Sequence, residues 1–441
     1  MAIQPKDLGL LRNHRFRRLL ESRLLGQAAH NAMVYSLLIL VVQETGSSLH
    51  TALLLLALVI PGIILAVPAG AAADILPKHL TLTIGYLLRA LFAAALVYTG
   101  DNLAFVYLLA IGSSAVGQFL SPAEAAAVPA IVRRDQLTAA NSWMLLTLVL
   151  GQVVGLVALA PLLLKIFDPQ AVFITSTVLF LTATYVIGWM AGGFSGREGP
   201  TPSSRGLREV AQEGFRIFGS DRDAYLATVY LTTGIAVSRA LIVLLPNYTE
   251  DVLNIQAEDM VFVAAPAAIG AGLGLLAAPF LQRLIGSWRS VVLGFGVFLL
   301  SVMALCIVVY ARDFLNDQIH LEPGISFVEE EVGVSSVITV TMLLAIPLGL
   351  AFTLLSVAAR VVINERAPPE AQGRVLAVQM ALGDLCSLLP LLFAGIAADA
   401  VGERPTLLVA TIATVAAVTY LSFSRRWGPR VGTLFDPAPA P

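Results

Sequence analysis

Four charged residues interrupt long apolar runs of the chain, and they are the residues best placed to do chemistry. A charge inside a bilayer is costly, and such residues usually face the interior of a helix bundle or an aqueous cavity. Arg239 and Arg89 lie well inside their runs, whereas Arg360 is close enough to the end of its run to reach water. Asp384 is the candidate for a protonatable or cation-pairing group. The alternative is a structural ion pair between Asp384 and one of the arginines.

Polar side chains also recur at helical spacing within the apolar runs. They are Gln27, His30, Asn31 and Tyr35 in one run, Ser114, Gln118 and Ser121 in another, and Gln379 in a third. Residues four apart share one face of a helix. They can either hydrogen-bond neighbouring helices or line a solvated path. Stripes on several helices, together with charges inside the membrane, favour a cavity.

The composition explains which elements must position these residues. The 441 residues are 57% hydrophobic and 13% charged, and the mean hydropathy is +0.83, whereas soluble domains are about 25% charged. The apolar runs are long enough to cross a bilayer as helices, at roughly 20 residues each. They show no two-residue alternation, which excludes a membrane barrel. The sequence therefore predicts an all-α polytopic membrane protein, with both cysteines in core packing positions.

Twelve spans are predicted, in two halves of six. The ranges are 22–43, 49–73, 79–99, 103–131, 138–164, 170–194, 224–246, 260–284, 289–311, 336–363, 375–398 and 404–424. The longest polar stretch between spans, 195–223, is rich in Gly, Pro, Ser and Arg and is typical of a linker, with a short surface helix expected at 207–218. It divides the chain into an N-terminal half, 1–194, and a C-terminal half with its tail, 224–441.

The charge pattern predicts the orientation. Lys and Arg gather in the terminal segments and the even-numbered loops, whereas the opposite loops hold acidic residues such as the run 329–331. By the positive-inside rule, both termini are expected in the cytosol, with the chain in the cell inner (plasma) membrane. The basic start of the chain is interpreted as a cytosolic lead-in to the first span, because no small-residue cleavage site follows it.

Several segments resemble the major facilitator superfamily, and in particular its drug and siderophore exporter branch. They are QETGSS at 43–48, FLSPAEAAAVPAIVRRDQLTAANS at 119–142, NERAPPEAQGRV at 364–375 and GIAADAVG at 395–402. The resemblance implies two six-helix halves that rock about a central site, so that each side of the membrane gains access in turn. It also implies a small-molecule substrate, a coupling ion that is expected to be a proton, and a monomer.

The resemblance extends to a conformational lock after the second span. The segment GAAADILPKH keeps Gly70, Asp74 and Lys78 of the family's loop, but Ile75 stands where the first Arg belongs. The exporter branch often carries an acidic residue where this chain has Asn31. Proton coupling is therefore expected at Asp384 instead.

Two glycine pairs suggest close helix packing. Gly151 and Gly155 lie in span 5, and Gly270 and Gly274 lie in span 8, each four residues apart, the spacing that lets helix backbones approach in lipid. The family's span 5 signature is otherwise changed, with Gln152 and Leu156 at positions usually occupied by Pro and Gly. Because these spans face each other across the halves in the superfamily, the resemblance implies that the pairs meet at a cytosolic gate.

The expected function is a proton-coupled exporter of a small amphipathic or cationic compound. The alternatives are a lipid or lysophospholipid flippase of the same fold and a non-transporting membrane receptor. An enzyme is not expected, because the chain lacks a phosphate-binding P-loop and an HExxH metalloprotease motif. No metal, cofactor or nucleic-acid partner is predicted.

Overall fold

The computed structural model describes residues 10–99, 102–133, 136–189, 221–251, 253, 255–307, 336–366 and 372–424. Every regular element in these ranges is helical, and twelve helices are long and apolar enough to cross a membrane. The predicted fold class and the number of spans are therefore confirmed. The predicted surface helix, 207–218, and the rest of the linker up to residue 220 lie outside the described residues, whereas a helix begins at Arg222, within the predicted end of the linker.

The first half of the chain contributes six spans. They are α1 (His14–Thr45), α2 (Ser48–Ile75), α3 (Lys78–Leu96), α4 (Leu103–Ile131), a composite span formed by α5 (Leu137–Val153), the π-helical segment Val154–Leu159 and α6 (Ala160–Ile166), and α7 (Pro169–Gly188). Within this half, α1 packs against α5 and α7, and α3 packs against α4 and α7.

The second half contributes the other six. They are α9 (Arg222–Asp251), α10 (Val261–Ile285), α11 (Ser287–Cys306), α14 (Ser336–Arg366), α15 (Gln372–Val401) and α16 (Glu403–Ser424), with a 3₁₀ turn at Ala257–Met260 before α10. Here α14 packs against both α10 and α11, while α9 packs against α15.

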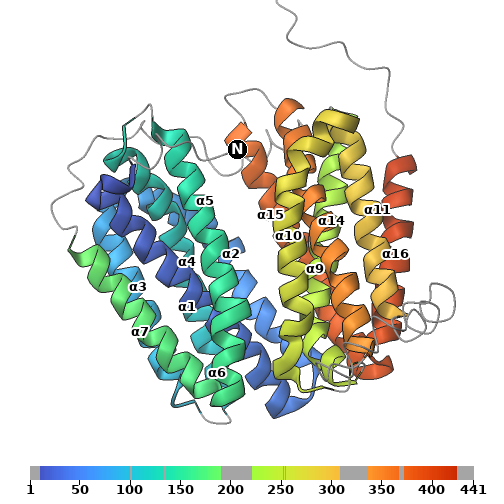
Figure 1. Ribbon diagram of the computed structural model, residues 1–441, viewed down its shortest axis with the longest axis horizontal. Coiled ribbons are helices and arrows are strands. Elements are labelled where there is room, and N and C mark those ends of the chain that lie inside the picture. The colour runs from blue at the N-terminus through green and yellow to red at the C-terminus, as the bar shows by residue number, and fades with distance from the viewer. Residues whose placement is uncertain are drawn as a thin grey trace, which may run out of the picture.

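The two halves lie side by side and meet mainly at one end (Figure 1). We call the end at which α1 begins the terminal end, and the opposite end the far end. Contacts between the halves are dominated by α2 against α15. In the view of Figure 1, the helices of the two halves converge at the far end and diverge toward the terminal end.

The first helix starts earlier than predicted. It begins at His14. The Asn13 side chain accepts a hydrogen bond from the backbone N–H of Arg15 at 3.1 Å and so forms the N-cap that starts the helix. The same Asn13 side chain donates to the carbonyl of Ile131 at 2.9 Å, which ties the cap to α4. The helix thus extends eight residues before the predicted span of 22–43.

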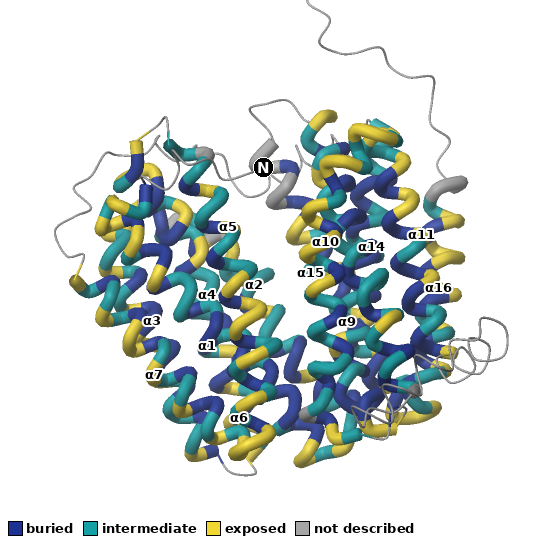
Figure 2. Tube along the Cα trace, in the orientation of Figure 1, coloured by how far each residue is buried: buried dark blue, intermediate teal, exposed yellow. Residues whose placement is uncertain are grey.

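The outward faces of the bundle are apolar. Leu276, Phe280 and Leu300 are among the large hydrophobic side chains that remain mostly exposed. Figure 2 shows exposed positions interspersed with buried ones along the helices of both halves. So much exposed apolar surface would be unfavourable in water, whereas lipid chains solvate it without cost.

Candidate functional site

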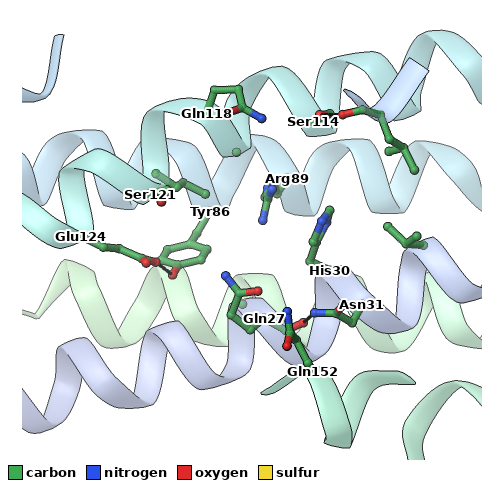
Figure 3. Close-up of a pocket in the computed structure, with 15 residues that line it drawn as sticks. Gln27, His30, Asn31, Tyr86, Arg89, Ser114, Gln118, Ser121, Glu124 and Gln152 are labelled. Carbon is green, nitrogen blue, oxygen red and sulfur yellow. Dashed lines mark hydrogen bonds between the residues drawn. The ribbon is translucent and has the colours of Figure 1, made fainter. Parts of the chain in front are cut away.

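A cavity of about 430 Å³ lies within the first half, among α1 to α5 (Figure 3). Most of its lining side chains are polar. They are Gln27, His30 and Asn31 of α1, Tyr86 and Arg89 of α3, Ser114, Gln118, Ser121 and Glu124 of α4, and Gln152 of α5; Gly26, Gly117, Val34, Leu58 and Leu120 complete the wall. These residues lie near the middle of their helices, so the cavity is at mid-depth in a membrane-spanning bundle.

The predicted stripe on α1 only partly faces this cavity. Gln27, His30 and Asn31 line it, and the Asn31 amide donates to the carbonyl of Gln27 at 2.8 Å. The Nδ1 atom of His30 is buried and has no hydrogen-bond partner among the described residues. Tyr35 is fully buried in the core instead. A helix turns once in 3.6 residues, so a position eight residues along is rotated by about 80° and leaves the cavity face.

The predicted residues of α4 and the glutamine of α5 complete the polar wall. Gln118 and Ser121 line the cavity, and the Ser114 hydroxyl donates to the carbonyl of Leu58 at 2.5 Å. Gln152, noted in the sequence only as a replacement for proline, faces the same space. Four side-chain amides are therefore available to hydrogen-bond a ligand.

Arg89 is a charged group of the cavity wall that has no ionic partner among the described residues. The residue is only 7% exposed, and its Nε donates to the carbonyl of Ser113 at 3.3 Å. Its guanidinium carbon lies 5.8 Å from the centre of the Phe180 ring. A Cβ at Gly117 would overlap the guanidinium, so this glycine leaves the space that Arg89 occupies. None of the ion pairs formed by the described residues includes Arg89.

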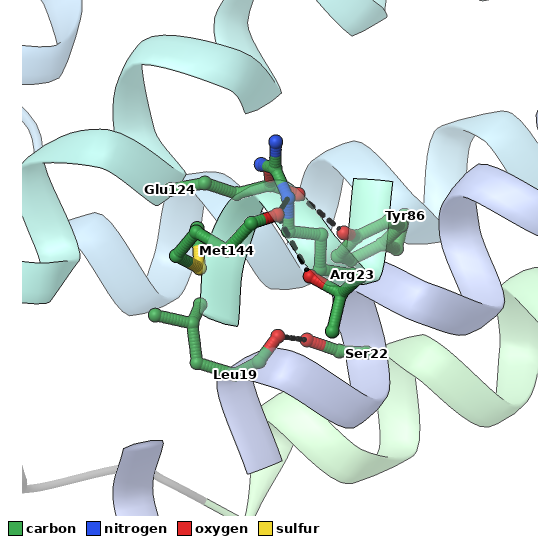
Figure 4. A network of polar contacts seen from close by, with 7 residues as sticks. Leu19, Ser22, Arg23, Tyr86, Glu124 and Met144 are labelled. Atoms are coloured by element: carbon green, nitrogen blue, oxygen red, sulfur yellow. Dashed lines mark hydrogen bonds and ion pairs between the residues drawn. The ribbon is translucent and has the colours of Figure 1, made fainter. Parts of the chain in front are cut away.

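A buried ion pair that was not expected from the sequence borders the cavity (Figure 4). Glu124 of α4 pairs with Arg23 of α1, and the Tyr86 hydroxyl donates to the same carboxylate at 2.6 Å. Nε of Arg23 also donates to the carbonyl of Met144 at 3.3 Å. The interpretation of Asp384 as the acidic residue inside a span was thus incomplete, since Glu124 is 3% exposed within α4. An acid within the apolar stretch 119–131 was the available signal.

The predicted polar residues of the second half lie apart from this cavity. Asp384 of α15 forms an ion pair with Arg239 of α9, which also donates to the Ser387 hydroxyl. The two charged side chains are 36% and 22% exposed. Gln379 is fully buried, and neither of its amide atoms has a partner among the described residues. Asp384 is thus paired with one of the arginines, and its role in proton coupling stays a prediction.

The glycine pairs pack inside their own halves. Gly151 and Gly155 lie against α1, close to Leu24 and Ala28, and Gly270 and Gly274 lie against α14. A Cβ at any of the four would overlap a neighbouring helix. These close approaches lie within each half, although the π-helical segment Val154–Leu159 also contacts α10 across the halves. The meeting of the two pairs at a cytosolic gate stays a prediction.

The predicted lock is only partly visible. Gly70 lies near the end of α2, where a Cβ added to it would have no neighbour within 4 Å, and Lys78 begins α3. The side chain of Asp74 lies outside the described residues. The lock therefore stays a prediction.

A joint between the halves, also not expected from the sequence, lies at the far end. The Asp399 carboxylate of α15 accepts hydrogen bonds from the backbone N–H groups of Ser48 at 2.7 Å and Leu49 at 3.3 Å, and from the Ser47 hydroxyl at 2.5 Å. Asn247 of α9 donates to the Ser48 hydroxyl at 2.8 Å. A carboxylate of one half thus caps the N-terminus of α2 in the other.

Comparisons with known proteins bear on this architecture. The sequence profile described as Major Facilitator Superfamily matches residues 24–389. No curated protein sequence matches the chain.

Solved structures of transporters share the fold at low identity. The inward-facing, unoccupied structure of a bacterial homologue of the human lysosomal transporter Spinster is 13% identical, with a TM-score of 0.70 over 94% of this chain and 99% of that chain. An inward-facing bacterial homologue of the iron transporter ferroportin is 16% identical, with a TM-score of 0.65 over 94% and 99%. An outward-facing bacterial homologue of ferroportin is 18% identical, with a TM-score of 0.54 over 93% of this chain and 99% of that chain. Likeness at this identity shows the fold alone.

Proposed function

The chain belongs to the Major Facilitator Superfamily and is a secondary transporter, and from this premise we propose that its substrate binds in the polar cavity of the first half. The observation that carries the proposal is a wall of amide, hydroxyl and charged side chains at mid-depth in a bundle whose outer surface is apolar. Polar groups at that depth are expensive in lipid unless they bind each other, water or a ligand. Substrate sites of secondary transporters lie at this level.

The arrangement of the halves supports alternating access. They are joined at the far end through α2 and α15 and diverge toward the terminal end. If both termini are cytosolic, as the basic loops predict, this arrangement is the inward-facing one. The higher TM-score with the inward-facing ferroportin homologue, 0.65 against 0.54 for the outward-facing one, agrees with that assignment.

The Asp384–Arg239 pair is the proposed site of proton coupling. Both side chains are partly exposed, so a proton from water can reach the carboxylate. Protonation would remove the negative charge and release Arg239 from its partner. Because the pair joins α15, which also forms the far-end joint, to α9, its breakage would alter the contact between helices that hold the halves together.

The substrate class that we propose differs from the one expected from the sequence. A cationic substrate was expected because the Asp384 carboxylate could pair with it. In the structure this carboxylate is already paired with Arg239. A flippase would need apolar walls for an acyl chain, whereas this cavity is lined mostly by polar side chains. The proposal is therefore a proton-coupled transporter of a small polar compound, and export is the direction that the exporter resemblance favours.

Substrate-induced proton movement in proteoliposomes tests this proposal. Wild type, Asp384→Asn and Gln118→Ala would be reconstituted with an internal pH dye and exposed to a panel of small anionic, neutral and cationic compounds under an imposed pH gradient. We expect gradient-dependent flux of at least one compound by the wild type, coupling lost in Asp384→Asn, and weaker flux in Gln118→Ala. Arg360→Gln is the control, because Arg360 is exposed on α14 and lines no part of the cavity.

The direction of the gradient that drives flux gives the direction of transport. Undiminished proton coupling in Asp384→Asn would contradict the coupling role. Flux that is undiminished in Gln118→Ala would contradict the proposed substrate site.

A further inference from the structure

We propose that Arg89 makes the cavity a site for an organic compound with a single negative charge on an oxyanion group, such as a carboxylate or a phosphodiester. This inference rests on the proposed function, because it names the substrate class of the same cavity. It comes from the charges buried around the cavity and from the way the guanidinium is held.

The charges that border the cavity do not cancel. Arg23 and Glu124 form an ion pair, so together they contribute no net charge. Arg89 is buried and takes part in none of the ion pairs formed by the described residues. A buried charge without a counterion is costly. The described residues that border the cavity therefore contribute one uncompensated positive charge, which a bound anion would neutralise.

The guanidinium is held so that its outer atoms remain available. Nε is bonded to the carbonyl of Ser113, and the group lies near the Phe180 ring. The space left by Gly117 lets the guanidinium approach α4 closely. The two terminal nitrogens make no hydrogen bond with any described residue and are not among the buried polar atoms that lack a partner. They are therefore accessible from the cavity, where Figure 3 shows them between Gln118 and Gln27.

A planar guanidinium with two free nitrogens matches an oxyanion. The two parallel N–H groups of an arginine side chain can donate to both oxygens of a carboxylate, or to two oxygens of a phosphate. A lysine places its charge at a single point and lacks this geometry. We therefore expect an anion to bind more tightly to arginine than to lysine at position 89, although both side chains carry the same charge.

The number of cations sets the charge of the ligand. Arg89 can neutralise one negative charge, and the other arginine beside the cavity, Arg23, is already neutralised by Glu124. A dianionic phosphate monoester would leave one charge unmatched. The amides of Gln27, Asn31 and Gln152 then remain for the uncharged, polar part of the compound. The volume of about 430 Å³ accepts a whole small carboxylate but only the headgroup of a lysolipid.

Matched anionic and neutral probes test the inference on the purified full chain. The probes are lactate and lactamide, hippurate and hippuramide, glycerophosphoglycerol as a soluble monoanionic phosphodiester, glycerol 3-phosphate as a dianion, and lysophosphatidylglycerol with monoacylglycerol as the lipid pair. Binding is measured by the ligand-dependent rise of Tm and by Kd. The variants are Arg89→Gln and Arg89→Lys, and Arg360→Gln is the charge-matched control on exposed surface.

We expect the wild type and Arg360→Gln to bind one monoanion at least about tenfold more tightly than its neutral partner, the discrimination expected of charge-assisted hydrogen bonds. Arg89→Gln should lose that discrimination, and Arg89→Lys should keep only part of it. Preference for a soluble anion or for lysophosphatidylglycerol distinguishes the two sources of the same chemistry. If Arg89→Gln does not fold, the wild-type preference and the Arg89→Lys loss still decide the question.

Three results would overturn the inference: equal binding of anions and their neutral partners, binding of no anion in the panel by the wild type, and an anion preference that survives in Arg89→Gln. The flux measurement separates this failure from failure of the proposed function. Flux of neutral or cationic compounds without any anion preference would keep the transporter and reject the anion site. Anion binding that depends on Arg89 without any flux would reject the proposed transport through this cavity and keep the site.

Discussion

Asp399 accepts a hydrogen bond from the backbone N–H of Ser48 at 2.7 Å, although the two residues belong to different halves of the molecule. The carboxylate lies at the N-terminus of α2, where the helix dipole and the unpaired N–H groups favour negative charge. Gly395, one turn before Asp399, has no side chain to separate α15 from the start of α2. A single carboxylate therefore contributes strongly to closure of the far end.

We predict that Asp399→Asn opens the far end. The amide keeps the size of the side chain but removes the charge and one acceptor oxygen, so the cap on α2 weakens by about 1 kcal/mol or more. Spin labels at the exposed positions Glu44 and Val401 would report a longer distance distribution in the variant. Asp168→Asn is the control, because Asp168 is exposed before α7 and makes no side-chain cap. An unchanged distribution would contradict the closing role.

Glu124→Gln should lower the stability of the first half. The substitution leaves Arg23, whose side chain is only 13% exposed, without its countercharge, and breaking a buried ion pair from one side costs about 3–5 kcal/mol. The measurement is Tm of the purified chain, and the double variant Arg23→Gln with Glu124→Gln should recover part of the loss. If the double variant is no more stable than Glu124→Gln, the pair does not act as a unit.

Gly117→Ala should weaken substrate binding without unfolding the chain. The added Cβ would overlap the guanidinium of Arg89, which is the end of a flexible side chain and can move away. The displaced group would lose its orientation toward the cavity, so the Kd for an anionic probe should rise several-fold while Tm changes little. Gly272→Ala is the matched control, because nothing lies within contact distance of that position. Equal Kd values in the two variants would contradict the prediction.

Gly270→Ala and Gly349→Ala should both destabilise the second half. A Cβ at Gly270 would overlap the backbone carbonyl of Ile346, and one at Gly349 would overlap that of Ala267. Backbone atoms cannot rotate away as a side chain can, so α10 and α14 would have to separate. We expect Tm to fall by several degrees in each variant and to stay within a degree in Gly272→Ala. Unchanged Tm values in the first two would show that the helices separate at little cost.

The anion site and the far-end joint show where prediction from sequence stopped. The apolar runs predicted twelve spanning helices, because the hydrocarbon thickness fixes the length of a span and the helix is the structure that satisfies its backbone within the span. The polar stripe on α1 also predicted three residues that line the cavity. Helix starts were less certain, since the Asn13 cap that begins α1 depends on local hydrogen bonds rather than on hydrophobicity.

The chain by itself determined its helices, its membrane character and the presence of charges at mid-depth, because these follow from composition and from periodicity within one segment. Only the tertiary structure decided which charges cancel. Glu124 meets Arg23 from a helix about a hundred residues away along the chain, and Asp384 meets Arg239, while Arg89 meets no carboxylate among the described residues. Whether a buried charge is a structural partner or a binding group depends on distances between helices, which no single segment specifies.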